Sequence, residues 1–259
     1  INIEITTKCN FDCNYCCSKT YPDEMMTFDK FKSIVDMWID IEQPIEFNLT
    51  GEGEGLLHPD IWTFVEYIKT NSRHRVSFIT NGSALNEYHR LQVVKYLDRI
   101  SISMDTTDVD LAERVGRHRM DRVIENIRAL SAVFPSIRIT TVDFGQPLDC
   151  VREFVREIHA THYVQKLFKK PDYSVVYTLF PVPQLNYPTN LNYKCMGLAS
   201  RMVAYNIKGV KMPCCYIKDT SVYPGYDEII EIFNDRYNTI PPKCCVGCVK
   251  LQPVALSYK

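Results

Sequence analysis

The chain has no apolar run approaching the length of a bilayer-spanning helix, and no signal-peptide pattern is visible. It also has no excess of either charge, because 30 Lys and Arg residues are balanced by 31 Asp and Glu residues, a net charge of -1. Such a balance provides no general electrostatic attraction to nucleic acid or to an anionic membrane, and we expect neither as a partner. Internal repeats and low-complexity tracts are absent as well.

Cysteine, in contrast, is unusually frequent, with eleven residues among 259. The cysteines lie toward the two ends of the chain, and only Cys150 stands between the two groups. Disulfide scaffolds are usually much smaller secreted proteins, whereas two separated groups of cysteines are typical of two metal sites in a reducing cytoplasm. A hydrophobic content of 46% indicates a core large enough for one α/β domain with a small appendage.

Strand and helix patterns alternate through the first 160 residues or so. Strand-like runs are expected at 1–7, 45–50, 76–80, 100–104 and 137–142, and helical periodicity at 28–41, 61–68, 87–97, 119–134 and 151–159. Repeated β-then-α units predict a parallel sheet with helices packed outside it. Ligands of such folds bind at the carboxyl ends of the strands, so the segments that follow the strands should meet at one rim.

The first group of cysteines follows the opening strand directly. Cys9, Cys13 and Cys16 are spaced C-x3-C-x2-C, so three thiolates from one loop can converge on one face of an iron–sulfur cube. One iron then stays open to a small molecule, whereas a cluster held by four cysteines only passes electrons. A zinc knuckle is the alternative interpretation of this spacing.

The second strand is followed by a run of alternating glycines and glutamates at 51–55. Glycine lets the backbone approach a ligand closely, and a carboxylate at the end of a strand can accept hydrogen bonds from an ammonium group. The alternative is a tight turn with solvated glutamates. The segment is therefore a candidate ligand-binding rim.

Together with the Thr-Asn-Gly sequence at 80–82 and Ser103-Met104-Asp105 at the fourth strand, these motifs resemble the radical S-adenosylmethionine (SAM) superfamily over most of residues 1–160. The resemblance implies an α/β fold, a partial (β/α)6 TIM-like barrel. It also implies a [4Fe–4S] cluster that binds SAM through its amino and carboxylate groups. In that family, an electron from the cluster cleaves SAM to methionine and a 5′-deoxyadenosyl radical, which abstracts hydrogen from the substrate.

Carried over position by position, the resemblance assigns Cys9, Cys13 and Cys16 to the cluster. It assigns SAM contacts to the backbone of Tyr15 (adenine), to Gly53 and Glu54 (ammonium group), to Asn81, to Ser103 and Asp105 (ribose or methionine portion), and to Arg114 (carboxylate). Asn81 as a turn former and Arg114 as a surface arginine are the alternatives. The chain departs from the family at Gly55, where proline is usual.

After about residue 163 the rhythm of strands and helices breaks. A stretch rich in proline and aromatic residues at 171–193 suits an irregular connector, and Lys208-Gly209 predicts the turn of a hairpin across 201–213. A short helix is expected at about 227–234. We therefore divide the chain into a barrel at 1–165 and a connector with a small second domain at 166–259.

The second group of cysteines resembles the C-terminal extensions called SPASM or twitch domains. This resemblance implies a twitch-type β-hairpin and helix extension with one auxiliary [4Fe–4S] cluster, held by Cys195, Cys214, Cys245 and Cys248. Cys215 and Cys244 are the alternatives to their neighbours Cys214 and Cys245 as ligands. A zinc ribbon is the alternative to the cluster itself.

For function, the resemblance implies a cytoplasmic, oxygen-sensitive enzyme that receives its electron from a donor such as flavodoxin or ferredoxin. We expect an oxidoreductase that dehydrogenates a sugar- or cyclitol-like small molecule, with the auxiliary cluster taking up the electron of the substrate radical. One alternative is an enzyme that epimerises or cross-links a peptide, with Cys215 as the hydrogen donor. Another is a zinc-binding or electron-transfer protein without catalysis.

Overall fold

The computed structural model describes residues 1–16, 18, 21–167, 192–196, 200, 202–212, 214, 231, 245, 248 and 251–254. Most of the expected connector, the expected helix at about 227–234 apart from Glu231, and the residues Cys17, Cys215 and Cys244 lie outside this part of the chain. Among the helices that the structure does describe, none combines the length and the apolarity needed to cross a membrane.

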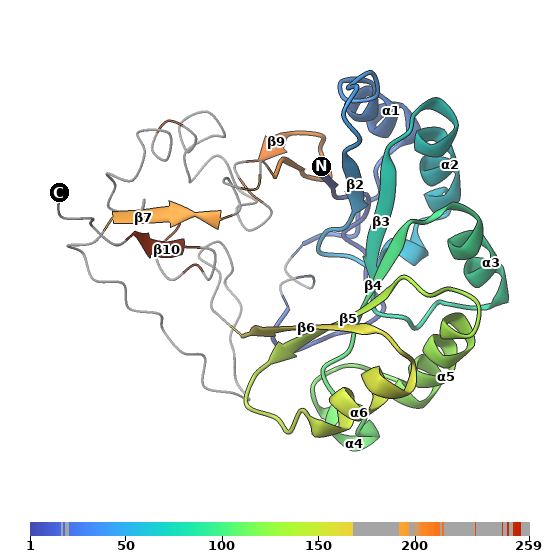
Figure 1. Ribbon diagram of the computed structural model, residues 1–259, viewed down its shortest axis with the longest axis vertical. Helices are drawn as coiled ribbons and strands as arrows, with labels where there is room; N and C mark the ends of the chain where they lie inside the picture. Colours follow the sequence, from blue (N-terminus) through green and yellow to red (C-terminus); the bar gives the residue numbers. More distant parts are fainter. Residues whose placement is uncertain are drawn as a thin grey trace.

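An eight-stranded sheet runs through the described part of the chain, in the order β6-β5-β4-β3-β2-β1-β8-β9 (Figure 1). Its parallel strands are β1 (Asn2–Ile3), β2 (Glu46–Leu49), β3 (Arg75–Thr80), β4 (Arg99–Ser103), β5 (Ile137–Asp143) and β6 (Thr161–Lys166). The segments between them form α1 (Phe28–Asp36), the 3-10 turn η2 (Gly55–Leu57), α2 (Ile61–Asn71), α3 (Glu87–Tyr96), α4 (Val109–Arg114), α5 (Met120–Ser131) and α6 (Asp149–Glu157). This architecture confirms the predicted α/β class with a parallel sheet.

The two faces of the sheet differ in chemistry. Figure 1 shows α1, α2, α3, α5 and α6 along one side of the curved sheet. Phe47 and Phe78 are fully buried and belong to the core that the sheet shares with these helices. Successive side chains of a strand point to opposite faces, so the neighbouring Asn48, Ser77 and Arg99, which lie side by side by register, point away from the core. On β2, β3 and β4, the face opposite the helices therefore carries a row of polar side chains.

Four elements differ from the sequence-based expectation. The opening strand, expected at 1–7, is a strand only at Asn2–Ile3. α1 ends at Asp36, because residues 37–41 continue as tighter turns in which the amide of Trp38 donates to Val35 O at 2.9 Å and the amide of Ile41 donates to Trp38 O at 3.3 Å. α4 has six residues, too few for a helical period to be visible. β6 is an edge strand with mostly exposed side chains, so it lacks the apolar alternation by which strands are recognised.

The predicted hairpin is present, as β8 (Ala204–Tyr205) and β9 (Lys211–Met212), and Gly209 in its turn has a φ of 79°. β8 is parallel to β1, so the hairpin extends the main sheet although its sequence lies far beyond the sixth parallel strand. β7 (Asn192–Cys195) and β10 (Leu251–Val254) form a separate antiparallel pair.

Candidate functional site

The cysteine loop, residues 8–16, follows the strand-like opening segment at the carboxyl end of the sheet, and the segment after β2 packs against its start. The amide of Gly53 donates to the carbonyl of Thr6 at 3.2 Å, and the amide of Glu54 donates to the carbonyl of Lys8 at 2.8 Å. A Cβ at position 53 would lie 2.5 Å from the Thr6 oxygen and 2.6 Å from the Lys8 oxygen. Only glycine permits so close an approach of two backbone segments.

The turn after α4 holds the other half of the cysteine loop. Gly116 has a φ of 81°, and its carbonyl accepts a hydrogen bond from the amide of Asp12 at 3.0 Å. The Sγ of Cys13 donates to the same carbonyl at 3.8 Å. A Cβ at position 116 would come within 2.5 Å of the Asp12 carbonyl oxygen. Glycines on two sides therefore determine the path of the cysteine loop.

Cys9, Cys13 and Cys16 lie partly exposed on this loop, close enough to affect one another's ionisation. Burial is the main reason that the pKa of Cys9 is raised to about 11 and that of Cys13 to about 12, and the neighbouring Cys16 contributes in the same direction. Without a ligand these two thiols are thus protonated at neutral pH. Metals bind the thiolate form, so a metal or cluster bound here would displace these protons.

Within the residues that the structure describes, no three His, Cys, Asp or Glu side chains converge closely enough to hold a single metal ion. Thiolates around one zinc ion stand about 2.3 Å from it. Three thiolates on a cube each bind a different iron, so they lie farther from one another than thiolates that share one ion. The finding therefore concerns a single ion and does not describe the ligand set of a cube.

Glu54, predicted to bind the SAM ammonium group, is only 2% exposed. Its carboxylate accepts hydrogen bonds from the Leu56 amide at 3.1 Å, the Thr80 hydroxyl at 2.6 Å and the Asn81 amide at 2.6 Å. Burial raises the pKa of Glu54, and these three hydrogen bonds oppose that effect. The carboxylate thus joins the rim after β2 to the end of β3, beside the cysteine loop.

Asn81 supports the cysteine loop from the end of β3. Its side-chain amide donates to Oδ1 of Asn10 at 3.0 Å and to Sγ of Cys9 at 3.9 Å. Its own Oδ1 accepts from the amide of Ser83 at 2.9 Å and from the hydroxyl of the same residue at 2.6 Å. Asn81 is therefore a turn former, and its amide also holds the first cysteine of the loop in place.

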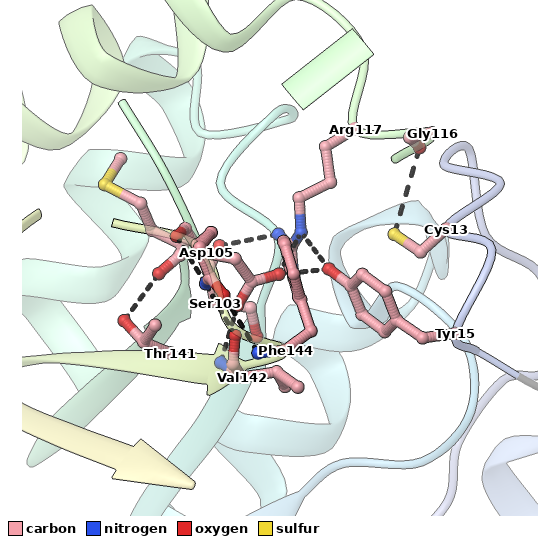
Figure 2. Close-up of polar contacts among 11 residues, drawn as sticks. Cys13, Tyr15, Ser103, Asp105, Gly116, Arg117, Thr141, Val142 and Phe144 are labelled. Atoms are coloured by element: carbon pink, nitrogen blue, oxygen red, sulfur yellow. Dashed lines mark hydrogen bonds and ion pairs between the residues drawn. The ribbon is translucent and has the colours of Figure 1, made fainter. Parts of the chain in front are cut away.

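A buried ion pair lies on the other side of the cysteine loop (Figure 2). Nε of Arg117 is 2.7 Å from Oδ2 of Asp105, and the two side chains are 6% and 0% exposed. The Tyr15 hydroxyl donates to the same Asp105 oxygen and accepts from Nε of Arg117 at 2.7 Å. Nη1 of Arg117 donates to the Ser103 carbonyl at 2.9 Å, and Oδ1 of Asp105 accepts from the Val142 amide at 2.7 Å.

Sequence reasoning singled out Arg114 and missed Arg117. Arg114 is exposed at the end of α4, whereas Arg117 is buried and paired. The two arginines stand three residues apart in one motif, and neither charge nor spacing distinguishes them; only the direction of the turn at Gly116 does. The Asp105 side chain, expected to face SAM, is fully buried and bonded to Arg117, Tyr15 and Val142.

The second group of cysteines is partly assembled by the β7–β10 pair. Cys195 stands opposite Leu251 in this antiparallel pair. The Leu251 amide donates to the Cys248 carbonyl at 3.1 Å, and the Cys248 amide donates to the Cys245 carbonyl at 3.0 Å. The backbone of Cys195 is thus linked through Leu251 to the backbones of Cys248 and Cys245. Cys214, two residues after β9, belongs to the described residues, but its position relative to these three cysteines stays a prediction.

Residues 3–158, more than half of the chain, match the Radical SAM superfamily. The chain belongs to this superfamily. A probable GTP 3′,8-cyclase of Methanococcus maripaludis is 32% identical over 109 residues, 41% of this chain and 36% of that protein. A GTP 3′,8-cyclase of Microcystis aeruginosa is 27% identical over 157 residues, 55% of this chain and 46% of that protein. The chain thus spans less than half the length of these curated relatives.

Solved structures of radical SAM enzymes have the same fold. Streptococcus suis SuiB bound to S-adenosylmethionine gives a TM-score of 0.68 at 15% identity, covering 89% of this chain and 67% of SuiB. Native anSMEcpe with bound AdoMet gives 0.64 at 12% identity, covering 89% and 80%. BtrN in complex with AdoMet and 2-DOIA gives 0.51 at 15% identity, covering 90% and 79%. These similarities confirm the predicted partial TIM-like barrel.

Proposed function

We propose that this chain is a radical SAM enzyme whose cysteine loop holds a [4Fe–4S] cluster through Cys9, Cys13 and Cys16. The observation that carries the proposal is the path of the cysteine loop, fixed at Gly53 and Gly116 at the carboxyl end of a parallel sheet. When bound, the cluster would supply the electron that cleaves SAM to methionine and a 5′-deoxyadenosyl radical.

The strand ends beside the cysteine loop would bind SAM. Gly53 and Glu54 would receive its ammonium group, Asn81, Ser103 and Asp105 would face its methionine or ribose portion, the backbone of Tyr15 would contact its adenine, and Arg114 would pair with its carboxylate. Support comes from the position of the 51–55 rim and Asn81, both within hydrogen-bond distance of the cysteine loop. For Asp105 the role includes a second task, because its carboxylate holds Arg117.

We propose an auxiliary [4Fe–4S] cluster at Cys195, Cys214, Cys245 and Cys248. Support comes from the backbone contacts that link Cys195, Cys248 and Cys245 through Leu251. A cluster with four cysteine ligands has no open iron, so its role would be to take up an electron rather than to bind substrate.

The favoured reaction is dehydrogenation of a sugar- or cyclitol-like molecule. Loss of a hydrogen atom to the adenosyl radical, then of a proton and of an electron to the auxiliary cluster, would convert an alcohol to a ketone. A polar substrate would suit the polar side chains at the carboxyl ends of β3 and β4, Asn81 and Ser103, which lie beside the cysteine loop and the Arg117 side chain. A flavodoxin or ferredoxin would supply the initiating electron.

Peptide modification is the second candidate. SuiB bound to its precursor peptide SuiA has the same fold, with a TM-score of 0.60, and anSMEcpe has been solved with a bound peptide, with a TM-score of 0.63. Cys215 remains the predicted hydrogen donor for an epimerase. The curated relatives add GTP as a third substrate to test. Deuterated cyclitol, peptide and GTP should be supplied in turn, because only the true substrate will transfer deuterium into 5′-deoxyadenosine.

The proposal is tested by anaerobic reconstitution with iron and sulfide. We expect about eight irons per chain for two cubes, and SAM with dithionite should yield 5′-deoxyadenosine. Cys9→Ser should lose about four irons and all cleavage, whereas Cys150→Ser, on α6 outside both cysteine groups, should keep both. Zinc in place of iron, or iron without cleavage of SAM, would favour the zinc-binding or electron-transfer alternative.

A further inference from the structure

Arg117 connects the cysteine loop to the ends of two strands. Its guanidinium binds the Tyr15 hydroxyl, which belongs to the cysteine loop, and the Ser103 carbonyl at the end of β4. Its chain neighbour Gly116 contacts the Cys13 sulfur through its carbonyl. The Arg117 side chain, through Tyr15, and the Gly116 carbonyl, through Cys13, thus both hold the Cys13–Cys16 half of the loop on the barrel.

The ion pair is not symmetric with respect to the cysteine loop. The Asp105 carboxylate receives a hydrogen bond from the Val142 amide of β5, and its backbone carbonyl receives one from Gln146 at 2.9 Å. Asp105 therefore lies on the β5 side. Arg117 lies on the side of Tyr15 and Cys13, as Figure 2 shows. The Tyr15 hydroxyl contacts both members of the pair, but Arg117 directly follows Gly116, whose carbonyl contacts the Cys13 sulfur, so the positive member is the one nearer the cysteines.

A buried ion pair is rarely the most stabilising way to join two segments. The free energy needed to remove both charges from water often makes the pair no more stabilising than apolar side chains of similar volume. The positive charge of Arg117 would, however, affect a cluster bound beside it. Three thiolates make such a centre negative, and reduction adds one more negative charge. A positive group nearby stabilises the reduced form more than the oxidised form, which raises the reduction potential.

We propose that Arg117 is a positioning residue that orients the cysteine loop through Tyr15 and Gly116 and raises the reduction potential of the cluster held there. The inference rests on the proposed function, because it requires a cluster at Cys9, Cys13 and Cys16. Arg117 acts through its fixed charge, and Asp105 and Tyr15 keep that charge on the side of the cluster.

A redox titration of the reconstituted full chain without SAM, followed by electron paramagnetic resonance, tests this charge. Arg117→Gln should shift the potential to more negative values, so that about tenfold less cluster is reduced at a fixed solution potential. Arg117→Lys keeps the charge and should stay near the original potential. Arg122→Gln removes an exposed arginine in the first turn of α5 and should leave the potential unchanged.

Since Arg117→Gln leaves the Asp105 carboxylate buried without its partner, that variant can fail to fold, and Asp105→Asn/Arg117→Gln is the second variant. This double variant removes both charges of the pair. Its potential should shift in the same direction but by less, because the lost Arg117 charge lies nearer the cluster than the lost Asp105 charge. Equal potentials in all variants, an equal shift in Arg117→Lys, or loss of the cluster from both neutral variants would each overturn the electrostatic role. These outcomes leave the proposed function intact, whereas failure of the original chain to load iron would overturn both.

Discussion

At the residue scale, two glycines carry constraints that no other residue meets. Gly53 has an ordinary φ, but its hydrogen atom lies where the backbone of residues 6–8 leaves no room for a Cβ. Gly116 combines the same closeness, toward Asp12, with a positive φ. Both positions contact the cysteine loop or the residues just before it, so a methyl group at either should displace the cysteines.

Gly53→Ala tests this constraint. Its Cβ would meet backbone atoms at 2.5 to 2.7 Å, which cannot yield as a flexible side chain can. We expect a loss of about 1–3 kcal/mol in the free energy of unfolding and a lower iron content after reconstitution, measured by urea denaturation and iron analysis. Gly55→Ala is the matched control, because its Cβ would meet only Ile5 Cδ1 at 3.9 Å. Equal behaviour of the two variants would contradict the packing argument.

At the scale of elements, one buried carboxylate links the turn of the β8–β9 hairpin to the rim after β2, in addition to the pairing of β8 with β1. Oε1 of Glu4 accepts from the amide of Glu52 in the 51–55 rim at 2.9 Å, and Oε2 accepts from the amide of Ile207 in the hairpin at 3.1 Å. The hairpin and the rim are thus held by opposite oxygens of the same side chain. Displacement of either segment should therefore disturb the hydrogen bond to the other.

Glu4→Ala should leave both amides without their acceptor, a loss of about 1–3 kcal/mol for each buried donor that water does not reach. Hydrogen exchange at Glu52 and Ile207 should accelerate together. Glu24→Gln is the control, because Glu24 meets the hairpin through a solvent-accessible ion pair with Lys208, and such pairs contribute about 0–1 kcal/mol. Exchange that rises at only one of the two amides would rule out a shared clamp.

At the scale of the whole molecule, stability should depend on pH through a buried histidine. Nδ1 of His58 accepts from the Asp60 amide at 3.1 Å, and Nε2 donates to the Met26 carbonyl at 2.9 Å, so the neutral ring uses both nitrogens. Burial lowers the pKa of His58 in the folded chain. The unfolded chain therefore binds a proton first as pH falls, and the folded state loses stability.

The free energy of unfolding should accordingly be highest above about pH 6.5 and decline as pH falls through the folded-state pKa. Urea denaturation between about pH 5 and 8 measures this slope. His58→Gln should reduce it, leaving the parts due to His89 and His162, whose pKa values burial also lowers, and the opposing part due to His118, whose pKa is raised by its hydrogen bonds to Glu113 and Asp12. A full slope in His58→Gln would show that other groups set the acid limit.

Much of the site is visible in the order of residues. A hydrogen-bonded parallel sheet brings its strand ends to one rim, so the sequence alone places Cys9, Glu54 and Asn81 together. The turn at Lys208-Gly209 is equally plain, since a positive φ favours glycine. These are local rules, and they depend on spacing and on backbone conformation alone.

Other features depend on contacts between segments far apart in sequence. Burial selects Arg117 over Arg114, and pairing with β1 places the hairpin in the main sheet. The same holds for Glu4, whose partners lie 48 and 203 residues away. Periodicity carries no information about which distant surface covers a side chain, because that is settled only when the sheet forms and its helices pack. Short sequence motifs thus identify the cysteines and the strand-end residues of the site, while tertiary packing places the charge of Arg117 beside the cysteines.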